Sequence, residues 1–327
     1  IISPVNVPAH RNSAMDGYAV RFADLKSDGD TTLTMIGTSF AGTQFAGVMK
    51  PGECVRIMTG GTVPEGADSV VMQERAQANG KNISIIAGVK QGQNVRYPGE
   101  DLKLGEAALN KGSVVRAAEL GLIASLGFAE VSVYRPLRVA FFSTGDELKS
   151  VGSQLGDGEI YDSNRYTIFG MLTRMGCEVL DMGVVRDDPA LLEAAFVEAA
   201  KNADVVITSG GVSVGEADYT KIILTKLGEV VFWKIAMKPG RPLAYGKVGG
   251  AHFFGLPGNP VSVMVTFYQF VRDALQVLMG RENVLPVPIL KAMCTSAIKK
   301  APGRTEFQRG ILTQNKTGAW EVCVTGD

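Results

Sequence analysis

The sequence predicts an α/β protein, in which a doubly wound, mainly parallel sheet is joined to a separate β-rich domain and a truncated C-terminal β domain. Short β-branched runs dominate the first part of the chain, apolar strands alternate with amphipathic helices from Leu137, and β-like segments return after about Leu285. We expect a β-rich domain at 1–104, a small connecting subdomain at 105–136, an α/β domain at 137–285 and the start of a C-terminal β domain at 286–327.

Length and composition support a protein with ordinary packed domains. The chain has 327 residues, 33 Lys plus Arg against 33 Asp plus Glu, and 46% hydrophobic residues. About two domains fit this length at roughly 150 residues each. The balanced charge disfavours nucleic acid as a partner, and no apolar run reaches the ~20 residues that span a bilayer. The N-terminus, which lacks Met and any basic-then-apolar pattern, predicts a fragment without a signal peptide.

The four cysteines predict neither a zinc site nor a redox pair. None of them forms a Cys-x-x-Cys motif, and all are interpreted as core residues in a reducing, cytoplasmic setting. They are Cys54, Cys177, Cys294 and Cys323.

The β-rich part is predicted from apolar runs separated by Gly, Asn, Asp and Pro. The pair Asn79-Gly80 is a hairpin signal. After this part, helical spacing over 117–127 predicts a helix with Leu120, Ile123, Ala124 and Leu126 on one face. The expected strands are 31–36, 54–58, 69–72 and 83–86.

The α/β part is predicted from near-continuous apolar strands that alternate with amphipathic helices, which favours a sheet covered on both faces. The expected strands are 138–142, 178–184, 204–208 and 230–235. The expected helices are 164–175, 189–202, 219–227 and 260–279. Two further β segments, 289–293 and 320–324, follow this part.

Ligands of an open α/β sheet bind beyond the carboxyl ends of its strands, so the loops there are the candidate site. The Gly-rich loop 209–215 can surround an oxyanion with backbone N–H groups. Asn259 as N-cap and Pro260 after it predict a helix start that offers a second anion site. The five loops expected to converge are 143–147, 186–189, 209–218, 238–242 and 255–260.

Charges of both signs occupy the same loops. Lys238 and Arg241 can bind an oxyanion, whereas Lys234 either joins them or is solvated at a strand end. Carboxylates at the same edge would repel an anionic ligand, and Mg²⁺ would resolve that conflict. These carboxylates are Asp146, Glu147, Asp187, Glu216 and Asp218. Asp188 is expected to cap a helix, and Asp218 either caps a helix or takes part in the chemistry.

Three polar segments of the β-rich part, 12–18, 56–61 and 96–101, are interpreted from their residues alone as turns. Neither His10 nor His252 stands in a recognisable Ser-His or Cys-His arrangement, so no nucleophile is predicted. His252, between Ala251 and Phe253, is expected to lie in a buried strand.

Beyond these arguments, the chain resembles the molybdopterin molybdenumtransferase family, which includes the bacterial MoeA protein and the related E domain of gephyrin. The resemblance runs in order along nearly the whole chain, and it departs from the family pattern at His10-Arg11. The motifs that carry it are NSAMDGYAV at 12–20, RIMTG at 56–60, VVMQE at 70–74, STGDEL at 143–148, SGGVSVGEADY at 209–219, KPGRP at 238–242, GLPGNPVS at 255–262 and FQRG at 307–310.

The resemblance implies an enzyme that converts adenylylated molybdopterin and molybdate, with Mg²⁺, to molybdenum cofactor and AMP. It implies a MogA-like α/β domain, a homodimer and a MogA-like adenylyltransferase as a partner, with no nucleic acid and no membrane. Implied catalytic residues are Asp187, Asp218, Glu147, Asp101 and Asp16, of which Asp187 and Asp218 are the metal ligands. Implied substrate-binding residues are Thr59, Ser143, Thr144, Gly145, Gly210, Gly211, Ser213, Gly215, Lys234, Lys238, Arg241, Gly258, Asn259 and Ser262.

Two other functions fit parts of the pattern. A nucleotidyltransferase that adenylylates molybdopterin would need only the α/β part, so the segments around Asn12 and Thr59 disfavour it. A scaffold that binds receptor tails, as gephyrin-like domains do, would show no ligand-dependent release of AMP.

Overall fold

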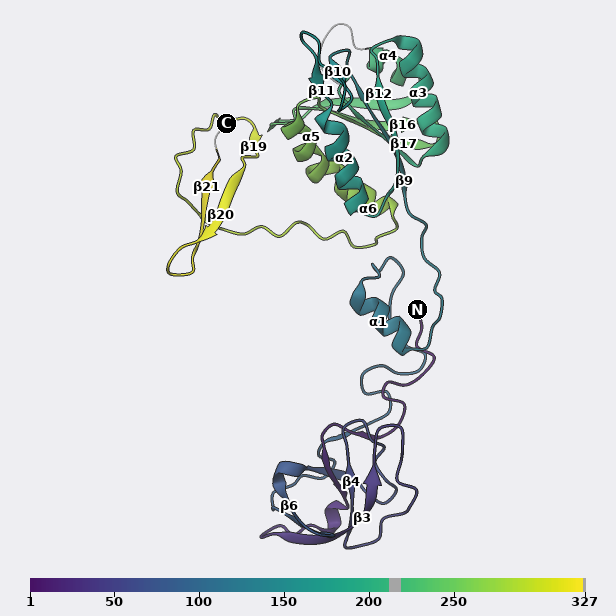
Figure 1. Ribbon diagram of the computed structural model, residues 1–327, viewed down its shortest axis with the longest axis vertical. Coiled ribbons are helices and arrows are strands. Elements are labelled where there is room, and N and C mark those ends of the chain that lie inside the picture. Colours follow the sequence, from purple (N-terminus) through teal and green to yellow (C-terminus); the bar gives the residue numbers. More distant parts are fainter. Residues whose placement is uncertain (212–218, 326–327) are drawn as a thin grey trace. The chain divides into compact units, whose positions relative to one another are not determined.

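The computed structural model describes residues 1–211 and 219–325, which form two compact units, Ile1–Val131 and Ser132–Asp327 (Figure 1). Each unit is described by itself. Four residues of the expected site, Ser213, Gly215, Glu216 and Asp218, lie outside the described residues. The finer division of the chain into four domains stays a prediction.

The first unit is built on a six-stranded sheet with the order β5-β2-β4-β3-β7-β6. Its faces bury two apolar clusters, one around Val55 and Ile57 and the other around Leu33 and Ile83. The four strands expected from sequence are all present. The strands are β2 (Gly17–Val20), β3 (Thr31–Ser39), β4 (Glu53–Ile57), β5 (Ser69–Met72), β6 (Ala76–Asn79) and β7 (Asn82–Ile85).

The predicted hairpin joins β6 to β7. Asn79 pairs with Asn82, so Gly80 and Lys81 form the turn, and Gly80 has a φ of +60° that favours glycine. Short elements complete the unit: the strands β1 (Asn12–Ser13) and β8 (Val95–Arg96), and the 3₁₀ helices Phe22–Asp24 and Gln73–Arg75.

The predicted connecting helix is α1 (Ala117–Ser125). The predicted helix is confirmed. Of the four residues expected to share a face, Ile123 and Leu126 are buried, whereas Leu120 and Ala124 are exposed.

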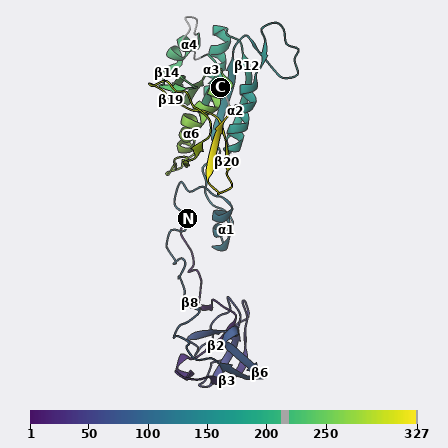
Figure 2. The same cartoon turned by 90° about the vertical axis from the view of Figure 1, so that its left-hand side faces the viewer.

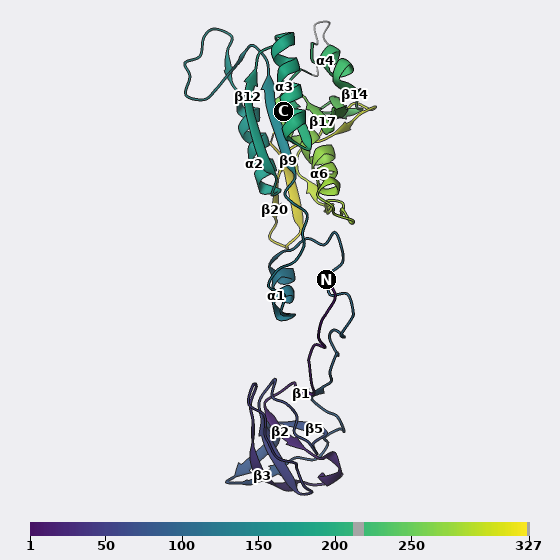
Figure 3. The same ribbon diagram turned by 90° about the vertical axis from the view of Figure 1, so that its right-hand side faces the viewer.

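The second unit contains a six-stranded sheet with the order β12-β9-β13-β17-β16-β14 (Figure 3). The strands β12, β9, β13 and β17 are parallel, whereas β16 runs antiparallel between β17 and β14. The four strands expected from sequence are present as β9, β12, β13 and β14, the buried strand expected around His252 is β17, and β16 was missed. The strands are β9 (Arg138–Thr144), β12 (Glu178–Val185), β13 (Val205–Ser209), β14 (Gly228–Lys234), β16 (Pro242–Val248) and β17 (Ala251–Leu256).

Helices cover both faces of this sheet, as the sequence predicts. Ile168 and Val263, from α2 and α5, pack with Phe141 on one face. Phe196 and Leu224, from α3 and α4, pack on the other face. The predicted last helix is one helical run interrupted by a π turn at Phe267–Val271. The helices are α2 (Ser163–Arg174), α3 (Pro189–Asn202), α4 (Tyr219–Leu227), α5 (Pro260–Thr266) and α6 (Arg272–Leu278).

The last part of the chain forms a small sheet with the order β18-β21-β20, whose strand β20 is drawn in yellow in Figure 2. The strand expected at 289–293 was wrong, because only Met293 joins a strand and Ile289 is 93% exposed. The bounds are β18 (Met293–Cys294), β20 (Gly310–Gln314) and β21 (Trp320–Val324). Two short pairs remain: β10 (Leu148–Lys149) with β11 (Ile160–Tyr161), and β15 (Met237–Lys238) with β19 (Thr305–Glu306).

The cysteines are free, but they are not all core residues. Cys54 is buried and Cys177 is half-buried, whereas Cys294 and Cys323 are exposed because they lie on the small C-terminal sheet. Among the described helices, none combines the length and the apolar character needed to cross a bilayer.

Candidate functional site

Four parallel strands of the second unit end at the same edge of the sheet, here called the carboxyl edge. Ser209 of β13 is aligned with Ser143 of β9 on one side and with Leu256 of β17 on the other. Val185, the last residue of β12, is aligned with Thr144. The strand β16 is antiparallel to both β17 and β14, so β14 runs in the same direction as β17 and also ends at this edge. The loops that follow these strands therefore begin side by side.

The loops after β9 and β12 are joined by hydrogen bonds. The Thr144 hydroxyl donates to Asp187 Oδ1 at 2.7 Å, and the Asp187 N–H donates to Asp146 Oδ1 at 3.3 Å. Thr144 is buried while both carboxylates are exposed. The buried hydroxyl thus fixes the orientation of an exposed carboxylate, which is a positioning role for Thr144.

The loop after β13 requires glycine where it passes the loop after β9. Gly210 has a φ of +89°, and a Cβ there would lie 2.5 Å from the Thr144 carbonyl oxygen. Gly211 has a φ of +66°, and its Cβ would lie 2.5 Å from Thr220 Oγ1. Both the backbone conformation and the close approach exclude larger residues. This close packing explains why the loop predicted from the sequence has glycine at these two positions.

The loops after β13 and β17 also lie in contact. The Gly210 N–H donates to the Leu256 carbonyl at 3.1 Å, and a Cβ on Gly258 would lie 3.9 Å from Gly210 Cα. A side chain that the sequence analysis missed, Asn164 of α2, donates to both Ser209 Oγ and the Gly258 carbonyl. The available signal was the amide in the first turn of a helix expected near this edge.

The remaining loop packs against the side of α5. Asn259 caps this helix, since its Oδ1 accepts from the N–H groups of Val261 at 3.0 Å and Ser262 at 3.3 Å. A Cβ on Gly240 would lie 2.7 Å from Thr266 Cγ2 and 3.6 Å from the Ser262 carbonyl oxygen. The 238–241 turn therefore lies along the side of α5, between Ser262 and Thr266. Within the described residues, four of the five predicted loops contact one another, and the fifth, 238–242, packs against α5.

The charges at this edge remain available to a ligand. Lys234, Lys238 and Arg241 are exposed, and none of them forms an ion pair within the described part of the chain. Glu147 is also exposed, and its carboxylate lies within 3 Å of where a Cβ on Gly145 would be. By contrast, Ser143 and Ser262 are buried, with 0% and 7% exposed.

Two of the helix caps expected from sequence are present. The Asp188 carboxylate accepts from the N–H groups of Ala190 and Leu191, both at 3.0 Å, which begins α3. It is therefore occupied as a cap, and the Asn259 cap described above begins α5.

The three polar segments of the first unit lie together. Asn12 pairs with Arg96, and the Ser13 carbonyl accepts from the Gly60 N–H at 2.8 Å. Arg96 forms an ion pair with Asp101. Segments interpreted only as turns thus form one exposed polar cluster.

Within this cluster Asp16 Oδ1 accepts from the Thr59 N–H at 2.7 Å and from the Thr59 hydroxyl at 2.8 Å. The backbone hydrogen bond, followed by the hydroxyl, lowers the pKa of the Asp16 carboxyl below its ordinary value, because both stabilise the charged form. Asp16 is therefore held as a carboxylate near neutral pH.

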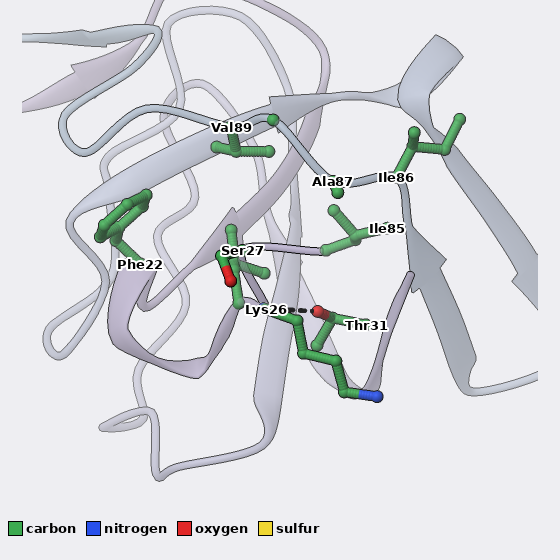
Figure 4. A pocket seen from close by; sticks show the side chains of 10 residues that line it. Phe22, Lys26, Ser27, Thr31, Ile85, Ile86, Ala87 and Val89 are labelled. Atoms are coloured by element: carbon green, nitrogen blue, oxygen red, sulfur yellow. Dashed lines mark hydrogen bonds between the residues drawn. The ribbon is translucent and has the colours of Figure 1, made fainter. Parts of the chain in front are cut away.

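A separate hollow of about 320 Å³ lies elsewhere on the first unit (Figure 4). Its walls are mainly apolar, and Thr31 Oγ1 accepts from the Lys26 N–H there at 2.9 Å. It is lined by Phe22, Leu25, Lys26, Ser27, Thr31, Ile85, Ile86, Ala87, Gly88 and Val89. No residue of the predicted site is among them.

Comparison with known proteins identifies the family. The model for the MoeA N-terminal region (domain I and II) matches residues 1–127, and that for a probable molybdopterin binding domain matches residues 140–277. The chain is 50% identical to a molybdopterin molybdenumtransferase from Haemophilus influenzae, over 100% of this chain and 80% of that protein. The chain belongs to the molybdopterin molybdenumtransferase family.

Other members of the molybdopterin molybdenumtransferase family agree with this assignment. Molybdopterin molybdenumtransferase 2 of Mycobacterium tuberculosis is 36% identical over 95% of this chain and 79% of that protein. The crystal structure of the Pyrococcus horikoshii MoeA molybdopterin biosynthesis protein matches with a TM-score of 0.81 at 28% identity, covering 98% of this chain and 80% of that one. The family and the fold class expected from sequence are confirmed, while the roles of single residues stay predictions.

Proposed function

We propose that this chain inserts molybdate into adenylylated molybdopterin and releases AMP, in the biosynthesis of the molybdenum cofactor. The observation that carries the proposal is that the five loops begin along one carboxyl edge, where four of them contact one another. There, glycine backbone, a capped helix start, exposed cations and exposed carboxylates lie along one edge of one sheet. Family membership supports the transferase activity.

The anionic groups of the substrates are assigned to the basic side of this edge. Molybdate is a tetrahedral dianion, which the planar guanidinium of Arg241 can bind with two hydrogen bonds and Lys238 can neutralise. The N–H groups of Val261 and Ser262 at the start of α5 already donate to the Asn259 cap, so this helix start would contribute only its dipole and not the free N–H groups expected from sequence. The phosphates of the pterin nucleotide are assigned to the loop that begins with Gly210 and Gly211, because a glycine-rich backbone can turn successive N–H groups toward an oxyanion.

The carboxylates in the loops after β9 and β12 fit Mg²⁺. Asp187 and Asp146 present hard oxygen donors, and Mg²⁺ is commonly held by one or two carboxylates together with substrate phosphates. Within the described part of the chain no group of three metal-ligating side chains occurs, so substrate oxygens would complete the shell. When bound, the ion would neutralise charge on the phosphoanhydride as it breaks. Thr144 keeps Asp187 oriented for this task, and Glu147 supports it.

The first unit contributes through a second copy of the chain. Asp16, Thr59 and Asp101 form part of one exposed polar cluster, and we assign them to the site of a partner subunit in a homodimer. The proposal includes a cytoplasmic location and a MogA-like adenylyltransferase that supplies the nucleotide substrate.

The test is an assay of AMP release from adenylylated molybdopterin with molybdate, with Mg²⁺ and with excess chelator. Asp187→Asn should lower the rate by roughly 100-fold or more, because it removes a carboxylate that holds the ion. Asp188→Asn is the matched control, since it removes one charge at the next residue and asparagine caps helices as well as aspartate. Unchanged AMP release in chelator would refute the metal, and equal losses in both variants would refute the role of Asp187.

A further inference from the structure

The amide of Asn164 joins two loops that the sequence separates widely. Its Nδ2 donates to Ser209 Oγ at 2.8 Å and to the Gly258 carbonyl oxygen at 2.7 Å. These partners are 45 and 94 residues away along the chain, and only 7% of Asn164 is exposed. The side chain is therefore a buried cross-link between the β13 loop and the β17 loop.

The orientation of this amide is determined by chemistry. The Gly258 carbonyl can only accept a hydrogen bond, so the nitrogen of the amide must face it. Both N–H groups are then used, one for each loop. Asn164 Oδ1 is buried and has no hydrogen-bond partner among the described residues. The donating atom thus forms every hydrogen bond that the structure records for this side chain.

Asn164 is held on a rigid support. It is the second residue of α2, whose first turn is capped by Asp162, because Oδ1 of that buried carboxylate accepts from the Arg165 N–H at 3.1 Å. The Arg165 guanidinium in turn forms an ion pair with Asp181 of β12 at 2.8 Å. The apolar face of the helix packs into the core through Ile168. The cross-link therefore transmits the position of a fixed helix to two loops.

Two longer hydrogen bonds join the same loops directly. The Gly210 N–H donates to the Leu256 carbonyl at 3.1 Å, and the Ser209 hydroxyl donates to the Pro257 carbonyl at 3.4 Å. Gly210 and Gly258 themselves lack side chains that could fix their backbone. Glycine-rich backbone is the most mobile kind when nothing fixes it. A buried double hydrogen bond from a third element removes that freedom before a ligand arrives.

We propose that Asn164 is a positioning residue, which fixes the distance between the phosphate-binding glycine loop and the loop that leads into α5 through Gly258. The inference rests on the proposed function, because that function assigns a substrate anion to this edge of the sheet. The positioning requires the N–H donors and not merely the size of the side chain.

Four variants separate a role of the Asn164 N–H donors from a role of its size alone. Asn164→Ala removes the cross-link, and Asn164→Asp keeps the size but offers only acceptors, which also repel the Gly258 carbonyl. Ser209→Ala removes one of the two Asn164 hydrogen bonds, together with the hydrogen bond from the Ser209 hydroxyl to the Pro257 carbonyl. Ser163→Ala changes the preceding, exposed residue of the same helix and is the matched control.

The measurements are steady-state AMP release at 25 °C and amide hydrogen exchange of the ligand-free full chain. We expect Asn164→Ala and Asn164→Asp to lower kcat/KM by roughly 10- to 100-fold, and Ser209→Ala to lower it less. In the Asn164 variants, amide hydrogen exchange should be faster than in the wild type in segments 209–211 and 257–262. Ser163→Ala should match the wild type in both measurements. Wild-type kcat/KM in Asn164→Asp, or a lower melting temperature alone with kcat/KM unchanged, would overturn the inference. If the wild type releases no AMP, the proposed function fails, and the exchange comparison decides whether Asn164 sets the loop separation.

Discussion

Gly210 is the position where a single methyl group tests most directly whether the loops pack as described. Gly210→Ala would place a Cβ 2.5 Å from the Thr144 carbonyl oxygen, in a backbone conformation with φ of +89°. The left-handed conformation costs an alanine roughly 1–2 kcal/mol, and overpacking against backbone costs roughly 1–3 kcal/mol. The free energy of unfolding should therefore fall by roughly 2–5 kcal/mol, which for a unit of this size lowers Tm by roughly 4–20 °C.

Gly258→Ala is the matched control in the neighbouring loop. A Cβ there would meet nothing closer than Gly210 Cα at 3.9 Å, so the change should stay within about 0.5 kcal/mol. Both tryptophans, Trp233 and Trp320, belong to the second unit, so tryptophan fluorescence follows the unfolding of that unit alone. A Tm for Gly210→Ala within 1 °C of the wild type, or equal losses in both variants, would show that the two loops do not pack as described.

Three further predictions concern charge and burial. Thr59→Val should raise the pKa of Asp16 toward its ordinary value, although the backbone hydrogen bond should still keep it lowered, and a carboxyl NMR titration would measure this. Because the pKa of Asp16 is depressed in the folded state, its contribution to stability is lost as pH falls. In the variant that loss should occur at a higher pH. The Asp204 carboxylate accepts from three N–H donors, and Asp204→Asn weakens this acceptor. The free energy of unfolding, measured with urea at pH 7, should therefore fall by about 1–3 kcal/mol. That difference should shrink as pH falls through the lowered pKa of Asp204, and an equal cost at pH 7 and pH 3 would contradict it. Burial raises the pKa of Cys54 to about 12 and of Cys177 to about 11, so at pH 8 a thiol reagent should modify only the other two cysteines until the chain unfolds.

Local patterns in the sequence were sufficient to place most elements. The helix 189–202 was predicted from its spacing and the Asp-Pro pair before it, because a cap and a proline are signals within a few residues of each other. The hairpin at Asn79-Gly80 was found for the same reason. The position of the candidate site also followed from sequence, since parallel strands end at one edge whatever their order in the sheet.

Features that depend on partners distant in the chain were not predictable in this way. The antiparallel strand β16, the exposure of Leu120 and the exposed thiol of Cys294 depend on which elements pack beside them. The segments around Asn12 and Gly60 resemble ordinary turns until the sheet of the first unit brings them together.

The sequence by itself determined which residue types stand at the carboxyl edge: glycines for the anion loop, cations and carboxylates beside it, and the asparagine cap of α5. Only the tertiary structure decided that Thr144 orients Asp187 and that Asn164 ties together two loops. The physical reason is that a hydrogen bond acts over about 3 Å, whereas these partners lie 43 to 94 residues apart, and the distances between them are set by the packing of whole helices against the sheet.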